Sequence, residues 1–268
     1  MPFPAPRPLP ENAGLACVGE RVALTAAIPP QLAERMLGAR NLHGKSNADV
    51  LRQLATATAP RRPTSHWLID FPAHMGEREA SLYEQPFHHL FHAKRPARDC
   101  WWVNPHADEH LRAMLARRER YLATPVGAEP PAWAWFDSAF IPDDTLLVVA
   151  RDDDFTHGVL AAHPFAVWWR KYHSRRTPIL ALSAYPFPWA PGTGLSALTA
   201  AQEEHRHAVA KAARGGGAES LNAAVAAAYG WPAGLGDSAL LARLGDLNRT
   251  RSAWVGGSGA GPSADVNQ

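Results

Sequence analysis

The chain has 268 residues, of which 46% are hydrophobic, and its formal net charge at pH 7 is +2. This length and composition allow one ordinary hydrophobic core plus an appendage, and the near-balanced charge identifies no class of partner. Two cysteines without a CxxC pair argue against both a disulfide framework and a cysteine-based zinc site.

The N-terminal part, residues 1–40, is expected to form an extended or linker segment. It is rich in proline at its start and contains an extended stretch at 22–28. A short helix is expected at 31–38, because prolines precede it and Gly38 ends it.

Residues 41–191 are expected to form an α/β domain. Its first part contains a segment at 50–55 whose periodicity favours neither strand nor helix, and a short strand at 66–71. A helix is expected at 76–92, where Pro86 must either kink it or split it in two.

The strongest strand signal lies at 145–150, a short apolar run that is β-branched in its middle and bounded by turn residues. The aromatic run at 133–136 is expected to pair with it as a neighbouring strand. Helices are expected before and after these strands, at 106–120 and 163–172, from the spacing of their apolar residues. The middle of the chain therefore predicts a small sheet with charged residues at its rim.

The composition changes after Pro191. Residues 192–255 are alanine-rich and predict a helical region, and the Gly/Ser-rich residues 256–268 predict a disordered tail. Within the helical region we expect three helices, at 195–214, 218–229 and 237–249, the last with Asp237 as its N-cap. The predicted fold class is α/β in the α+β sense: a small mixed sheet flanked by helices, followed by a small all-helical C-terminal unit.

Neither a targeting segment nor a membrane span is expected. The chain does not open with a charged segment followed by an apolar run, and no apolar run is long enough to cross a bilayer. Since the cysteine usage also suits a reducing compartment, we expect a cytoplasmic protein without membrane contact.

The sequence lacks the motifs of several enzyme classes. It contains no glycine-rich loop after a first strand and no Asn/Asp-Pro-Pro-aromatic tetrad, both of which an amino-methylating methyltransferase needs. It also contains no P-loop and no GxSxG elbow. We therefore expect no bound SAM and no catalytic residue in this chain.

Three aspartates flank the predicted strand at 145–150. Asp143, Asp152 and Asp154 resemble the acidic half of a metal-dependent nuclease site, where carboxylates hold Mg²⁺. The lysine that such sites place beside the second acid is missing. A turn aspartate and a solvated strand end, with Arg151 or Arg120 as ion-pair partner, is the alternative.

Three histidines lie close together in the predicted helix at 76–92. His88, His89 and His92 include i,i+3 and i,i+4 spacings, which place two imidazoles on one helix face and could hold a metal ion. There is no HExxH frame. A solvated helix end is the simpler interpretation.

Basic residues form four separate groups that are interleaved with aromatic residues. Guanidinium groups bind phosphates through paired hydrogen bonds and can also read guanine edges. If the groups share one face, they form a nucleic-acid interface; ordinary solvated arginine is the alternative. The residues that we expect to contact DNA are Arg61, Arg62, Arg118, Arg120, Tyr121, Arg151, Arg175 and Arg176.

A series of short motifs then resembles one known family in order along the chain. The motifs lie at 47–52, 67–71, 79–83, 120–125, 135–138 with Pro142 and Asp143, 150–155, 158–160, 185–188 and 223–232. Together they resemble the target-recognition domain and C-terminal helical region of MmeI-like SAM-dependent adenine-specific DNA methyltransferases of type IIG restriction-modification systems. The resemblance covers residues 12–248.

The resemblance implies that this region reads a DNA sequence for an adenine-N6 DNA methyltransferase. The catalytic and nuclease domains of the family are missing, in agreement with the missing motifs, so SAM is expected only in a separate catalytic partner. That partner would dock on the C-terminal helices, and double-stranded DNA would be the second partner. The arginine-rich segment before Trp101 is shorter than in the family. A split specificity subunit, a non-functional remnant and a nuclease using Asp143, Asp152 and Asp154 therefore remain as alternatives.

Overall fold

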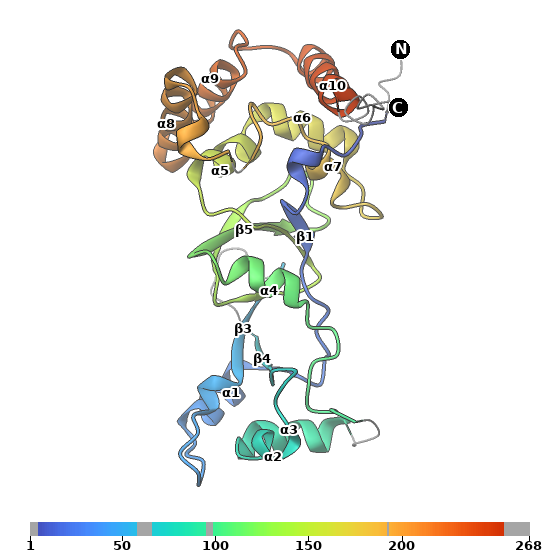
Figure 1. The fold of residues 1–268 in the computed structure, drawn as a ribbon, viewed down its shortest axis with the longest axis vertical. Coiled ribbons are helices and arrows are strands. Elements are labelled where there is room, and N and C mark those ends of the chain that lie inside the picture. Colours follow the sequence, from blue (N-terminus) through green and yellow to red (C-terminus); the bar gives the residue numbers. More distant parts are fainter. Residues whose placement is uncertain (1–4, 58–65, 95–98, 192, 255–268) are drawn as a thin grey trace, which may run out of the picture. The chain divides into compact units, whose positions relative to one another are not determined.

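The computed structural model describes residues 5–57, 66–94, 99–191 and 193–254 (Figure 1). The chain divides into two compact units. Unit 1 consists of Met1–Ala16, Gly127–Trp133 and Arg151–Gln268, and unit 2 consists of Cys17–Val126 and Ala134–Ala150. The expected tail at 256–268 lies outside the described residues.

The first sheet has the strand order β1-β8-β5-β6. Strand β5 pairs antiparallel with both β6 and β8, so that Leu122 lies opposite Trp135 on one side and Val149 on the other. The strand predicted at 145–150 is confirmed as β8. The prediction that the run at 133–136 pairs with it is wrong, because β5 lies between them. The strands are β1 (Ala16–Val18), β5 (Arg120–Pro125), β6 (Ala134–Asp137) and β8 (Leu146–Val149).

A second sheet, with the order β2-β4-β3-β7, makes the described part of unit 2 a two-sheet structure where we expected one. Its antiparallel pairs are β2–β4 and β3–β4, and β3 pairs in parallel with β7. The segment at 50–55 is thus a strand, and the strand at 66–71 is confirmed. The strands are β2 (Ala27–Ile28), β3 (Leu51–Ala55), β4 (Trp67–Ile69) and β7 (Ile141–Pro142).

The helices of unit 2 follow the local sequence signals, with one boundary misjudged. The helix expected at 31–38 is present, and the one at 76–92 splits in two, with Pro86 in the first turn of the second part, where its missing N–H is tolerated. The helix expected at 106–120 is shorter and spans Glu109–Leu115, and β5 begins at Arg120. These helices are α1 (Pro30–Gly38), α2 (Glu77–Ala80), α3 (Glu84–Lys94) and α4 (Glu109–Leu115).

The core of unit 2 includes residues from the expected N-terminal linker. Ile28, Ala33 and Met36 are buried in the same cluster as Leu68 and Phe71. Part of the segment at 1–40 therefore packs as core.

Unit 1 is largely helical among its described residues (Figure 1). The helices expected at 163–172, 195–214, 218–229 and 237–249 are confirmed, but the helix at 154–161 was not expected. It begins at the acidic cluster, because the Asp153 carboxylate caps it by accepting from the Thr156 N–H at 2.7 Å. The helices are α5 (Asp154–Ala161), α6 (His163–Tyr172), α7 (Leu180–Ser183), α8 (Ala200–Gly215), α9 (Ala218–Ala228) and α10 (Asp237–Trp254).

The N-terminal segment is bound to these helices. The Asn12 side-chain amide donates to the carbonyls of Leu182, Ser183 and Tyr185, at 3.1, 3.1 and 2.8 Å. The Asn248 side chain donates to the Arg7 carbonyl at 2.8 Å and accepts from the Arg7 N–H at 3.1 Å. These long-range contacts make residues 7–12 part of the helical unit.

No helix among the described residues is long and apolar enough to cross a membrane.

Candidate nucleic-acid interface

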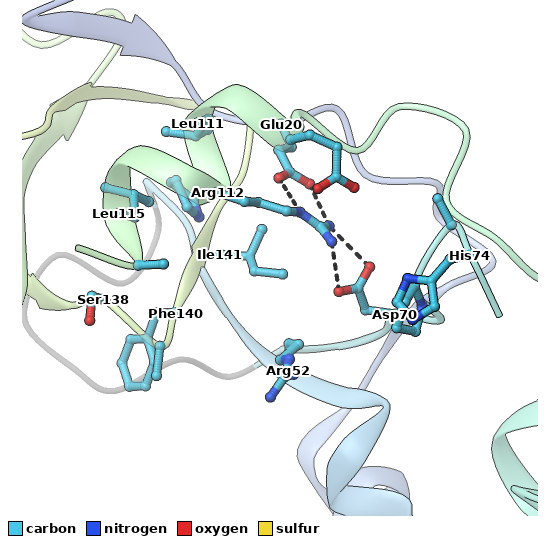
Figure 2. A pocket seen from close by; sticks show the side chains of 16 residues that line it. Glu20, Arg52, Asp70, His74, Leu111, Arg112, Leu115, Ser138, Phe140 and Ile141 are labelled. Atoms are coloured by element: carbon cyan, nitrogen blue, oxygen red, sulfur yellow. Dashed lines mark hydrogen bonds and ion pairs between the residues drawn. The ribbon is translucent and has the colours of Figure 1, made fainter. Parts of the chain in front are cut away.

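A buried ion cluster forms in unit 2, where Arg112 lies between two carboxylates (Figure 2). Its Nε and Nη2 donate to the two oxygens of Glu20 at 2.6 and 2.8 Å. Its Nη1 and Nη2 donate to the two oxygens of Asp70 at 2.9 and 3.0 Å. Arg112 therefore forms a bidentate ion pair with each carboxylate, which is the strongest geometry between a guanidinium and a carboxylate.

Three separate elements place these side chains. Arg112 lies on α4, next to the buried Leu111; Asp70 directly follows β4; and the Glu20 N–H donates to the Pro142 carbonyl at 2.8 Å. The side-chain exposures are 22% for Arg112, 0% for Glu20 and 8% for Asp70. Burial alone would lower the pKa of Arg112, but its hydrogen bonds to Glu20 and Asp70 outweigh burial and raise that pKa.

The ion cluster borders a cavity of about 550 Å³ (Figure 2). Apolar side chains of α4 and of the segment before β7 form much of its wall. Its labelled lining residues are Glu20, Arg52, Asp70, His74, Leu111, Arg112, Leu115, Ser138, Phe140 and Ile141.

Sequence reasoning missed this cluster. One local signal was available, because Asp70 is a lone carboxylate between Ile69 and Phe71 in an otherwise apolar strand. Such a position predicts a buried and paired charge. Nothing in the sequence indicates which of the arginines is its partner.

Three of the expected DNA-contact residues lie in unit 2, near the start of β5. Arg118 is half-buried, and its N–H donates to the Leu115 carbonyl at 2.9 Å. Arg120 stacks on Trp135, with its guanidinium carbon 3.8 Å from the ring centroid. Tyr121 is fully buried, stacks on Phe136 and donates to the Phe140 carbonyl at 3.1 Å, so we assign it to the core.

Three others lie in unit 1. Arg151 forms an ion pair with Asp153 at 2.8 Å. Arg175 is exposed and lies over Gly127, where a Cβ atom would meet the Arg175 Nε at 2.7 Å. Arg176 is exposed as well.

Arg175 and Arg176 follow the end of α6, which also carries the exposed Arg170 and Lys171. Arg170 is 3.2 Å from the Asp237 carboxylate. The structure therefore gives four exposed cations within residues 170–176 of unit 1. Arg61 and Arg62 lie outside the described residues.

The two metal sites considered from the sequence differ in what the structure says of them. No group of three or more His, Cys, Asp or Glu side chains among the described residues could hold a metal ion. The Asp143 carboxylate accepts from the Thr145 N–H at 3.1 Å, and Asp154 is 3.6 Å from Arg214. His88, His89 and His92, all on α3, therefore form no such group, whereas Asp143 lies in unit 2 and Asp152 and Asp154 lie in unit 1, so the nuclease site stays a prediction.

Cys17 provides a test of burial in unit 2. Burial, with a smaller effect of the Asp108 carboxylate, raises the pKa of the Cys17 thiol to about 11. Because the thiolate is the reactive form, we expect Cys17 at pH 8 to react with iodoacetamide about a hundredfold more slowly than an unshifted thiol. Mass spectrometry of timed samples measures this rate, with the exposed Cys100 as internal reference. Equal rates for the two cysteines at pH 8 would contradict the burial of Cys17.

No protein-family model and no curated protein sequence matches this chain. Among solved structures, the chain is similar to the type IIL restriction-modification enzyme MmeI, whose structure was determined in complex with DNA. The TM-score is 0.62 and the sequence identity is 12%, over 94% of this chain and 36% of that chain. The chain thus spans little more than a third of MmeI. Over nearly its whole length, its fold is similar to that of one part of a restriction-modification enzyme.

Proposed function

We propose that the chain is a DNA-binding module of a restriction-modification system, which reads a duplex sequence for a catalytic subunit. The observation that carries this proposal is the fold similarity, which covers 94% of this chain but only 36% of MmeI. A chain that matches one part of such an enzyme over 94% of its own length suits the specificity function of a restriction-modification system. The partner would be a SAM-dependent adenine-specific DNA methyltransferase.

The cations available for this function differ in how they are held. Arg175 and Arg176 are exposed and suit phosphates, which carry most of the affinity of protein–DNA complexes. Arg120 is pre-oriented by Trp135, and Arg151 by Asp153, which suits a contact that needs a fixed geometry. Arg61, Arg62 and Arg118 remain candidates. Tyr121 is not included, because its side chain is fully buried.

The proposal predicts sequence-selective and salt-sensitive DNA binding. We expect selection from random duplex DNA to yield one motif. In the Arg175→Ala/Arg176→Ala variant, we expect the slope of log K against log salt to become shallower by about 2. Each arginine–phosphate contact contributes about 1 to this slope, because it releases counterions from the DNA, and the variant loses two such contacts. Electrophoretic or fluorescence titrations at several salt concentrations measure both quantities.

A matched control removes the same charge elsewhere in unit 1. Arg243 and Arg249 are exposed on α10, and their double alanine variant should keep the slope of the wild type. Weak binding without a selected motif would contradict the proposal and favour a non-functional remnant. Equal slopes for both double variants would remove Arg175 and Arg176 from the interface.

The catalytic partner is proposed to dock on the exposed face of α8 and α9. Truncation at Pro191 is a poor test, because α5 packs against α8 in the same unit (Figure 1). Charge reversal at the exposed Glu204 and Lys211 leaves this packing intact. Loss of co-purification with the methyltransferase in that variant, with DNA binding unchanged, is the expected result.

A further inference from the structure

The cavity beside the ion cluster in unit 2 has the size and the composition of a small-molecule site. Its volume of about 550 Å³ lies within the range of pockets that enclose a ligand. Leu111, Leu115 and Ile141 give it an apolar wall, and seven of its sixteen lining residues are polar or charged. The pattern of the polar groups in such a cavity determines which ligand it selects.

That pattern contains a donor beside an acceptor. Four of the five guanidinium N–H groups of Arg112 bind Glu20 and Asp70. The fifth, on Nη1, has no acceptor among the residues that the structure describes, and the same Nη1 lies 2.9 Å from Oδ2 of Asp70. That oxygen can accept a further hydrogen bond. A neighbouring donor and acceptor of this kind match the base-pairing edge of a nucleobase, which carries at least one of each.

Two more lining residues suit the rest of a nucleotide. Phe140 is half-buried and offers an aromatic ring for stacking. Arg52 is exposed on β3, and no carboxylate in the described part of the chain pairs with it. An exposed guanidinium that lines such a cavity and has no carboxylate partner among the described residues suits a phosphate group.

We propose that this cavity binds one nucleotide, with the base edge on Arg112 and Asp70, the base face on Phe140 and the phosphate on Arg52. The nucleotide has two possible sources: a nucleotide extruded from bound duplex DNA, or a free nucleotide. The first source rests on the proposed function, and the second does not.

A mismatch scan tests the first source. A single mismatch is placed in turn at each position of the selected duplex, and the affinity of the full chain is measured. Because a mismatched base costs less to extrude, one position should bind about tenfold more tightly than the matched duplex. Phe140→Ala and Arg52→Ala should each remove this gain, whereas Phe91→Ala, an exposed aromatic residue outside the cavity, should keep it.

Calorimetry with dAMP, dCMP, dGMP and dTMP tests the second source. Binding that the same two cavity variants abolish, without any mismatch gain, assigns the cavity to a free nucleotide. Normal selection of a DNA motif, with neither a mismatch gain nor nucleotide binding, overturns the inference and leaves the proposed function intact. Nucleotide binding by a chain that selects no DNA motif has the opposite meaning: the cavity assignment holds and the proposed function fails.

Discussion

The Arg112→Ala variant is expected to lose about 3–5 kcal/mol of the free energy that stabilises unit 2. The substitution leaves the carboxylates of Glu20 and Asp70, 0% and 8% exposed, without their cation. Two uncompensated charges in a buried position cost far more than the lost contact is worth. Hydrogen exchange measured by mass spectrometry reports this loss in β3, β4 and α4 separately from the helices of unit 1.

Two further variants identify the cause. Arg117→Ala removes an exposed arginine two residues after α4 and should change stability by less than about 0.5 kcal/mol. The triple variant Arg112→Met/Glu20→Leu/Asp70→Leu removes all three charges and should recover at least half of the loss, since an apolar replacement leaves no unpaired group. A loss below about 1 kcal/mol for Arg112→Ala, or a triple variant no better than the single one, would show that the cluster is not a buried ion pair.

This cluster marks the limit of prediction from one sequence. The elements that we predicted correctly, such as β8, α1 and α6, have a continuous apolar run or a 3.6-residue period between proline and glycine signals. Those signals are local. Glu20 and Asp70 lie 92 and 42 residues from Arg112, and only the tertiary fold brings the three together.

The errors have the same cause. The run at 133–136 has the composition of a strand and is one, but its partner is β5. No strand was expected at 120–125, and Arg120 was placed at the end of a helix. The Asp152–Asp154 cluster was interpreted as the charged rim of a sheet, although Asp153 is the N-cap of α5. An aspartate after a strand fits both a strand end and a helix start, and here the apolar spacing of the next eight residues distinguishes them.

The candidate interface was predictable in kind but not in detail. Composition and spacing identified the basic groups, including the exposed Arg175 and Arg176. They could not show that Tyr121 is buried, because burial depends on neighbours in space. The pairing of Arg151 with an aspartate of the adjacent cluster was one of the alternatives, and Asp153 is the partner.

The second large effect is expected at Gly158, in the middle of α5. A Cβ atom at this position would meet Cγ1 of Val209 at 2.7 Å, Cβ of Ala213 at 3.2 Å and Cδ1 of Leu221 at 3.3 Å. Alanine is a better helix former than glycine by about 1 kcal/mol. We nevertheless expect Gly158→Ala to destabilise unit 1 by about 1–3 kcal/mol, because the methyl group overpacks a contact between three helices.

Gly245 provides the matched control, because it lies within α10 and a Cβ atom there meets nothing within 4 Å. The same substitution should therefore stabilise the chain by about 0.5–1 kcal/mol through helix propensity alone. Denaturant unfolding followed by hydrogen exchange in α5, α8 and α9 compares the two variants. Opposite signs mean that α8 and α9 pack on α5 as closely as a core requires, so that a catalytic partner can use only their outer face. A stabilising Gly158→Ala would mean that this packing is loose, and a partner could then insert between these helices.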